Sequence, residues 1–346
     1  MKRNWMIRAK RISALLLGTV LLGSLATGCG GSSSSDNDSA AEGGTTTIQM
    51  ATGGQDTLPS YATVLDVIDD IQENTDIEFS YFGSRQLGDD AEIVQQVMAG
   101  TIQMGGTAAS ALSTYTDLLD AFTVPFLLDT YEKEREAMVS EEAQAIFDAV
   151  EEELGLKIFV AYDSGMRYFA NTIRPIETLD DVKGLVLRVA PADILLDSFS
   201  AMGINPSTLA YGELYTGLQN GTIDGEEINI TSIYSEKHYE VLKYFTDMGI
   251  YPFATVIFAN ADWFNSLPAD EQEAIQSAFT NGYNYLFDQH LPEAEAAGLQ
   301  AMEDAGIEIS SVQNPQEFRD AVADVVETYR NRDDLTKAFI EMAEGL

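Results

Sequence analysis

The sequence has little cysteine, histidine or basic charge, and each shortage excludes a class of protein. Its single cysteine, Cys29, rules out a disulfide within the chain. Its two histidines, His238 and His290, cannot form the His/Cys cluster of a zinc site. The G-x-S-x-G signature of serine hydrolases is absent as well. We therefore expect a protein that is not an enzyme and that uses neither a metal nor a cofactor.

The scarcity of lysine and arginine excludes further partners. The chain holds 19 basic residues against 56 acidic ones, a net charge of −37. Five of the basic residues fall within the first eleven positions, so residues 12–346 carry a net charge of −42. Such a surface repels nucleic acid and anionic lipid. We expect no nucleic-acid partner and no direct binding to a membrane surface.

The N-terminus has the pattern of a secretory signal peptide, expected over residues 1–28. A basic start precedes an apolar stretch from Ile12 to about Leu22, which is too short for a stable membrane span. The ending Leu-Ala-Thr-Gly-Cys resembles a bacterial lipobox, which implies acylation of Cys29 and a lipid-anchored protein in the periplasm or at the cell surface. The alternative is an ordinary cleaved signal. Residues 29–45, rich in Gly and Ser, predict a flexible tether.

The remaining chain has the composition of a globular protein. Hydrophobic residues make up 45% of the sequence, and 346 residues suffice for about two domains. Strand-like segments such as 77–82 alternate with segments of helical spacing such as 60–75, which predicts an α/β fold with a mostly parallel sheet. Towards the C-terminus we expect long helices, with a kink or break at Pro292 and a helix end near Ala305.

A short internal repeat in the sequence indicates two related halves. Residues 94–107 and 215–228 both read as a helix, a glycine, Thr-Ile and a polar or small turn. If each of two α/β domains contains this unit, residues 105–107 and 226–229 face one crevice from opposite walls, because ligands bind beyond the carboxyl ends of such strands.

Arg188 is a scarce cation inside the apolar run Leu185–Ala190. One explanation is that its stem lies along apolar surface while its charged head stays in water. The other is that the guanidinium faces a cleft and grips a carboxylate bidentately. Because an unpaired buried charge is strongly destabilising, a buried Arg188 requires a partner.

Several ordered motifs together resemble one known family. They are the segments 84–104 (SRQLGDDAEIVQQVMAGTIQM), 124–128 (VPFLL), 180–193 (DDVKGLVLRVAPAD), 209–229 (LAYGELYTGLQNGTIDGEEIN) and 260–279 (NADWFNSLPADEQEAIQSAF). In this order they resemble the DctP-like substrate-binding proteins of TRAP transporters, the tripartite ATP-independent periplasmic systems. The resemblance covers about residues 48–340.

The resemblance implies a type II periplasmic-binding-protein fold, with two α/β lobes around a ligand cleft and long C-terminal helices. Strand crossings near 165 and 254 would make both lobes discontinuous: lobe I would hold residues 46–164 plus 255–293, and lobe II residues 165–254 plus 294–346. The cleft would close on its ligand about a hinge. The closed form would then deliver the ligand to a two-subunit TRAP membrane carrier, and we expect the protein to be a monomer.

The resemblance also implies ligand-binding residues in lobe II. Arg188 resembles the arginine that clamps the ligand carboxylate, and Arg167 resembles the second ligand arginine. Asn229 resembles the amide that hydrogen-bonds the ligand, and Tyr211 matches an aromatic that packs on it. The structural alternatives are a surface crossover residue for Arg167, a turn cap for Asn229 and core packing for Tyr211.

In lobe I, Asp90 and the pair Thr107 and Ala108 fall where the family's polar contacts lie. A helix N-cap and a tight turn are their alternative roles. Thr52 and Gly53 end the first strand, where backbone N–H groups can meet ligand oxygens.

The family takes small organic acids. Residues 162–176 (YDSGMRYFANTIRPI) resemble the form found in sugar-acid binders, which favours a hexuronate over a C4-dicarboxylate. The alternative function is a ligand-sensing lipoprotein that reports to a receptor instead of a carrier.

Overall fold

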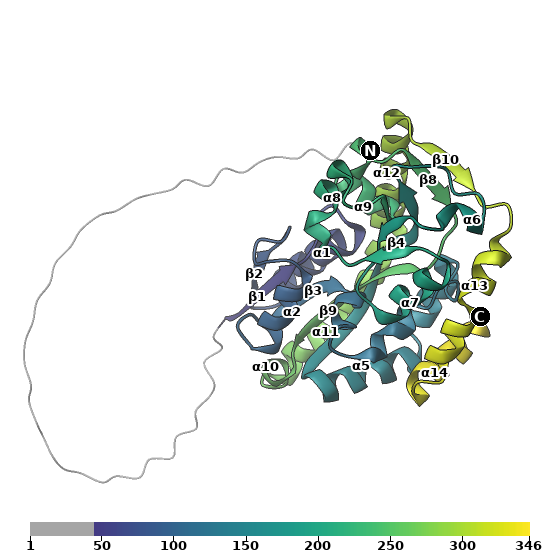
Figure 1. Cartoon of the computed structure of the whole chain (residues 1–346). Helices are drawn as coiled ribbons and strands as arrows, with labels where there is room; N and C mark the ends of the chain where they lie inside the picture. Colours follow the sequence, from purple (N-terminus) through teal and green to yellow (C-terminus); the bar gives the residue numbers. More distant parts are fainter. Residues whose placement is uncertain (1–44) are drawn as a thin grey trace, which may run out of the picture. The chain divides into compact units, whose positions relative to one another are not determined.

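The computed structural model describes residues 45–346 (Figure 1). The expected signal peptide, the lipidation site Cys29 and the tether up to residue 44 lie outside the described residues. Among the described residues, no helix is both long enough and apolar enough to cross a membrane.

Strands and helices alternate along the first half of the described chain, as the sequence predicts. The elements are β1 (Thr46–Thr52), α1 (Pro59–Asn74), β2 (Ile77–Phe82), α2 (Asp90–Met98), β3 (Met104–Ala108), α3 (Ala109–Leu112), the 3-10 helix η1 (Asp117–Thr123), α4 (Tyr131–Met138), α5 (Glu141–Leu154) and β4 (Leu156–Asn171).

The second half continues the alternation and ends in helices. Its elements are α6 (Leu179–Val182), β5 (Val186–Arg188), α7 (Asp193–Ala201), β6 (Asn205–Ser207), η2 (Tyr211–Glu213), α8 (Leu214–Asn220), β7 (Gly225–Asn229), α9 (Ile230–Ser235), η3 (His238–Glu240), β8 (Tyr244–Asp247), β9 (Pro252–Asn260), α10 (Ala261–Asn265), α11 (Ala269–Tyr285), the π-helix η4 (Leu286–His290), α12 (Leu291–Ala305), β10 (Glu308–Ser311), α13 (Pro315–Arg330) and α14 (Asp334–Glu344).

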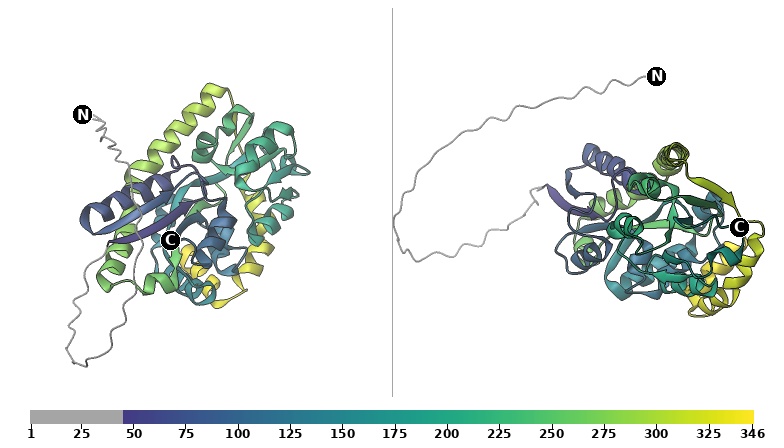
Figure 2. Two further views of the ribbon diagram at one scale, coloured as in Figure 1. Left: turned by 90° about the vertical axis from the view of Figure 1, so that its left-hand side faces the viewer. Right: turned by 45° about the horizontal axis from the view of Figure 1, so that its top comes forward.

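The long strand β4 joins two halves of one sheet, whose order is β2-β1-β3-β9-β4-β7-β5-β6; β8 also pairs with β4, and β10 pairs with β8. Figure 2 shows the first strands, in purple, and the C-terminal helices, in yellow, on opposite sides of the molecule. Up to Met166, β4 pairs with β9, and from Arg167 onwards it pairs with β7 and β8. We call the half with β1, β2, β3 and β9 lobe I and the half with β5 to β8 and β10 lobe II.

The sheet is less parallel than the sequence predicts. The outer strands of each lobe pair in parallel, for example β1 with β2 and β3, and β5 with β6 and β7. The crossing strands β4 and β9 make antiparallel pairs with each other, β4 also with β7 and β8, and β9 with β3. Two neighbouring strands that carry the chain between the lobes in opposite senses must be antiparallel.

The chain bends where β4 passes between the lobes. The register with β9 shifts between Asp163 and Met166, and Gly165 has φ 109°, a backbone conformation that favours glycine. The expected crossings near 165 and 254 stay a prediction, as do the lobe boundaries.

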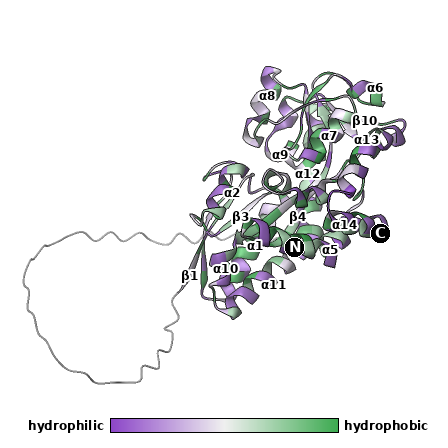
Figure 3. Cartoon of the chain, turned by 60° about the horizontal axis from the view of Figure 1, so that its bottom comes forward, coloured by the Kyte–Doolittle hydropathy of each residue, from purple (hydrophilic) through white to green (hydrophobic). Residues whose placement is uncertain are grey.

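The C-terminal helices pack on both lobes. On α13, Phe318 lies 6.1 Å (ring centres) from Phe169 of β4, and on α14, Phe339 lies 5.0 Å from Phe122 of η1. Helices α11 and α12 form one continuous helical segment, in which the break expected at Pro292 is the π-helical turn η4 just before it. Hydrophobic residues concentrate on the central strands, while the outer helices carry both polar and apolar residues (Figure 3).

Candidate ligand-binding site

A cavity of about 320 Å³ lies between the two lobes. Among the residues that line it are Gly53, Tyr61, Asp90 and Ala108 from lobe I, Arg188, Leu209 and Tyr211 from lobe II, and Arg167 and Phe253 from the crossing strands. This volume falls within the range of about 300–1,000 Å³ that is usual for small-molecule sites.

The structure brings together six of the nine residues that the sequence singles out. Gly53, Asp90, Ala108, Arg167, Arg188 and Tyr211 all line the cavity. Thr52, Thr107 and Asn229 do not line it, and each is fully buried. Contact of these three with a ligand stays a prediction.

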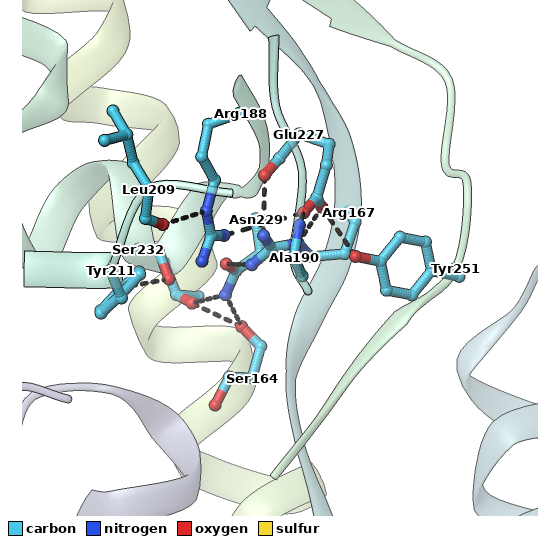
Figure 4. A network of polar contacts seen from close by, with 11 residues as sticks. Ser164, Arg167, Arg188, Ala190, Leu209, Tyr211, Glu227, Asn229, Ser232 and Tyr251 are labelled. Atoms are coloured by element: carbon cyan, nitrogen blue, oxygen red, sulfur yellow. Dashed lines mark hydrogen bonds and ion pairs between the residues drawn. The ribbon is translucent and has the colours of Figure 1, made fainter. Parts of the chain in front are cut away.

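Arg188 ends β5, which lies between β6 and β7, so its side chain leaves the carboxyl end of a central strand. The residue is only 6% exposed. Its Nε donates to the Leu209 carbonyl at 3.2 Å, and its Nη1 lies 3.8 Å from Glu227 Oε1 (Figure 4). Within residues 45–346, neither terminal nitrogen donates a hydrogen bond, so a buried guanidinium fork faces the cavity.

Arg167 is held differently, because each of its three nitrogens already donates to the protein. Nε donates to Glu227 Oε2 at 2.6 Å, Nη2 to the Glu227 carbonyl at 2.7 Å, and Nη1 to Asn229 Oδ1 at 3.0 Å. Its guanidinium carbon also lies 4.8 Å from the Phe253 ring centre. Burial lowers the pKa of Arg167, but the Glu227 carboxylate outweighs this effect and raises the pKa above its usual value.

Glu227 lies in the segment 226–229 that the sequence aims at the crevice, but its pairing with both arginines was not expected. It is fully buried, and its Oε2 also accepts from the Tyr251 hydroxyl at 2.8 Å. Its Oε1 accepts from the Ala190 N–H at 2.7 Å. One carboxylate therefore compensates two arginines, which leaves one unit of positive charge in the group. Adjacent acidic residues carry little information in so acidic a chain, but Glu227 and Asn229 share one face of β7, which is a signal that could have found them.

Asn229 lies behind Arg167 (Figure 4). Its Oδ1 accepts from Arg167, while its Nδ2 donates to the Ser164 carbonyl at 2.6 Å and to Thr231 Oγ1 at 2.7 Å. The Ser164 carbonyl belongs to the bend of β4. Asn229 thus ties the position of Arg167 to that bend.

Asp90 supplies a carboxyl group on the lobe I side of the cavity. The N-cap of α2 is Asp89, whose side chain accepts from the Asp90 N–H, so the capping role considered for Asp90 belongs to its neighbour. Within the described residues, the buried Oδ1 of Asp90 has no hydrogen-bond partner. Burial, with the charge of Asp89, raises the pKa of Asp90 to about 7, against the opposing effect of Arg188 and Arg85.

Tyr211 forms part of the cavity wall, whereas the two histidines lie elsewhere. The Tyr211 ring lines the cavity, and its hydroxyl lies 2.9 Å from Ser232 Oγ. His238 is buried against Glu226 at 2.8 Å, His290 pairs with Asp66 at 2.8 Å, and neither lines the cavity. Residues 45–346 contain no group of three or more His, Cys, Asp or Glu residues that could hold a metal ion.

Known proteins resemble this chain over most of its length. An ectoine/5-hydroxyectoine-binding periplasmic protein of Ruegeria pomeroyi is 28% identical over 263 residues, which cover 74% of this chain and 77% of that protein. A 2,3-diketo-L-gulonate-binding periplasmic protein of Escherichia coli is 28% identical over 284 residues, which cover 79% and 84%. A TRAP periplasmic solute-binding protein of Xanthobacter autotrophicus, solved with bound β-D-galacturonate, is 26% identical with a TM-score of 0.80, covering 86% of this chain and 99% of that one.

The sequence profile described as "Bacterial extracellular solute-binding protein, family 7" matches residues 51–333. The expected two-lobed α/β fold is confirmed by its likeness to solved TRAP solute-binding proteins. The expectation that the chain is not an enzyme is confirmed too, since the family consists of solute-binding proteins. The chain therefore belongs to the bacterial extracellular solute-binding protein family 7, the DctP family, and is a substrate-binding protein of the TRAP transporter type.

Proposed function

We propose that the protein captures a sugar acid such as a hexuronate and delivers it to a two-subunit TRAP membrane carrier. A C4-dicarboxylate is the next candidate ligand. The observation that carries the proposal is the guanidinium of Arg188, which is buried, lines the cavity and has two terminal nitrogens without a hydrogen-bond acceptor in residues 45–346. A planar fork of this kind binds a carboxylate with two parallel hydrogen bonds.

The charge balance of the group formed by the two arginines and Glu227 supports an anion with one negative group. Arg167, Arg188 and Glu227 together carry one positive charge, which a single carboxylate neutralises. The sugar-acid carboxylate binds Arg188 in our proposal. Each terminal nitrogen of Arg167 carries two N–H groups and donates one of them to the protein, so the second N–H remains for the ligand.

Asp90 supports a sugar acid over a dicarboxylate. When ionised, its carboxylate accepts hydrogen bonds, which the hydroxyl groups of a sugar acid can donate. A second ligand carboxylate would instead meet a like charge, unless Asp90 is protonated. The rings of Tyr61, Tyr211 and Phe253 also line the cavity and offer apolar faces to a sugar ring. The galacturonate bound by the Xanthobacter protein agrees with this choice.

The proposal places the protein outside the cytoplasm, attached to the membrane through a lipid on Cys29. Wild-type protein should incorporate a radiolabelled fatty acid in growing cells and Cys29→Ser should not, which immunoprecipitation after metabolic labelling would detect. Absence of the label from the wild-type protein would contradict lipid anchoring.

A thermal-shift and calorimetry panel tests the ligand class. We expect D-galacturonate or D-glucuronate to raise Tm by several degrees, because a ligand well above its Kd stabilises the folded state by a few kcal/mol. Succinate, L-malate and a neutral hexose should have smaller effects. Arg188→Gln should abolish the shift, whereas Arg330→Gln, which changes the last residue of α13, should preserve it. A dicarboxylate that shifts Tm more than any sugar acid would contradict the proposed ligand class, and an Arg188→Gln variant that still responds would contradict the site.

A further inference from the structure

A third arginine lies at the rim of the cavity and joins the two lobes. Arg85 follows β2 in lobe I, and Glu236 follows α9 in lobe II. Arg85 Nη1 donates to Glu236 Oε1 at 2.8 Å, and Nη2 donates to Oε2 at 2.9 Å. The two side chains are only 18% and 11% exposed. This bidentate, largely buried ion pair connects residues 151 positions apart in the sequence.

The backbone of Arg85 is held in a conformation that favours glycine. Its φ is 63° and that of the preceding Ser84 is 53°, both in the left-handed region. The Arg85 N–H donates to the Thr52 carbonyl at 3.2 Å, which fixes the turn against the end of β1. A large side chain in a strained backbone position often has a function that outweighs the strain.

The other contacts of Arg85 reach residues that line the cavity. Its guanidinium carbon lies 5.4 Å from the Tyr211 ring centre, and its Nη1 lies 3.4 Å from the Gly53 carbonyl. A second bond crosses the cleft next to it, from the Gly212 N–H to Asp89 Oδ2 at 3.2 Å. Arg85 itself does not line the cavity. It therefore holds lining residues of both lobes while its charge is directed at Glu236.

We propose that Arg85 and Glu236 form a clasp that holds the ligand cleft closed and keeps Tyr211 over the cavity. The guanidinium of Arg85 is directed at Glu236 and does not line the cavity, so this arginine is a positioning residue and not a ligand clamp. Separation of the lobes, and with it ligand release, requires that this ion pair break. The clasp proposal rests on the proposed function only in the identity of the ligand that the cleft encloses.

The distance between the lobes in the absence of ligand tests the clasp. Spin labels would be attached at Glu73→Cys on α1 and Gln219→Cys on α8, two exposed positions in different lobes. In the full-length chain, Cys29→Ser removes the only native cysteine. Double electron–electron resonance then gives the populations of closed and open forms, with no need for an identified ligand.

We expect Arg85→Gln and Glu236→Gln each to raise the ratio of open to closed forms about fivefold, as for a well-formed, partly buried ion pair. The double variant should open no further than either single variant, because both remove the same interaction. Sodium chloride at high concentration should open the wild type in the same direction. Arg330→Gln is the matched control, since Arg330 forms a comparable pair with Glu344 within the C-terminal helices, and it should leave the distances unchanged.

Arg85→Gly separates loss of the ion pair from misfolding, because glycine adopts the left-handed backbone conformation without strain. It should fold and still open the cleft. Wild-type distances in Arg85→Gly and Glu236→Gln would overturn the clasp, as would additive opening in the double variant. Because this readout needs no ligand, it is independent of whether a sugar acid binds.

Discussion

Glu227 and Arg188 face each other across 3.8 Å without a hydrogen bond. The oxygens of Glu227 are engaged elsewhere, by Arg167 and Tyr251 on one side and by the Ala190 N–H on the other. Coulomb attraction at this distance orients the guanidinium of Arg188. The terminal N–H groups of Arg188 are thereby left for a ligand, which makes Glu227 the residue that prepares the site without entering it.

Replacement of Arg188 is expected to weaken binding of the organic acid without disrupting the fold. Arg188→Ala should weaken binding of the best organic acid of the panel by about 2–5 kcal/mol, roughly 1.5 to 3.5 decades in Kd. The fold should persist because Glu227 keeps Arg167 as its partner. Isothermal titration calorimetry gives the Kd and circular dichroism the fold. An unchanged Kd would show that the ligand carboxylate binds elsewhere.

Replacement of Glu227 is expected to act on stability first. Glu227→Gln removes the charge that compensates the buried Arg167, so the free energy of unfolding should fall by about 3–5 kcal/mol in urea titrations. Glu226→Gln is the matched control, because Glu226 lies on the same strand, is equally buried and pairs with a histidine, which can lose its charge. Equal losses in the two variants would contradict the special role of Glu227.

The sequence predicted the parts of the site that local motifs carry. Arg188 stands out because a charged side chain inside an apolar strand requires a partner. Gly53 follows from the end of the first strand, and Asp90 from the resemblance to the family. The motifs also led to the two-lobed fold. These signals come from residues that are close in sequence, or from an order of segments that resembles a known family.

What the sequence did not reveal depends on registers between distant strands. Glu227 meets Arg167 because Asn229 pairs opposite Arg167 across β4 and β7, so position 227 falls on the same face. The antiparallel pairing of the crossing strands likewise follows from the path of the chain in space. The Arg85–Glu236 pair joins loops of the two lobes, and the sequence of neither loop indicates which residue it will contact.

The affinity for the ligand should depend on pH through the titration of Asp90. Burial, together with Asp89, raises its pKa to about 7, so Asp90 becomes an acceptor-only carboxylate as the pH rises through that value. If sugar hydroxyls donate to it, affinity for a hexuronate should increase about tenfold between pH 6 and pH 8. Affinity for a dicarboxylate should change in the opposite direction.

Asp90→Asn is the test of that assignment, measured as Kd against pH by calorimetry. The amide does not titrate, so the pH dependence of hexuronate binding should flatten. A slope that persists in the variant would assign the titration to another group.

Two buried acids, one on α4 and one at the bend of β4, lie together, and the sign of their effect on stability can be worked out. Glu134 of α4 and Asp163 of β4 are each 1% exposed, and each has one buried carboxyl oxygen without a hydrogen-bond partner in the described chain. Burial raises the pKa of Asp163 to about 7, and burial with the Asp163 charge raises that of Glu134. The unfolded chain releases the Asp163 proton near its usual pKa, so stability falls as the pH rises from about 4 to about 7.

Asp163→Asn should therefore stabilise the protein at pH 8 by about 1–3 kcal/mol and change little at pH 4. The amide removes the buried charge, can donate to Glu134 and retains the oxygen that accepts from the Gly165 N–H. Asp181→Asn is the control of opposite sign, because hydrogen bonds from Thr178 lower the pKa of Asp181 and its stabilisation is present at pH 8. Urea unfolding at the two pH values measures both variants. A gain for Asp163→Asn that is equal at pH 4 and pH 8 would mean that it comes from packing and not from the buried charge.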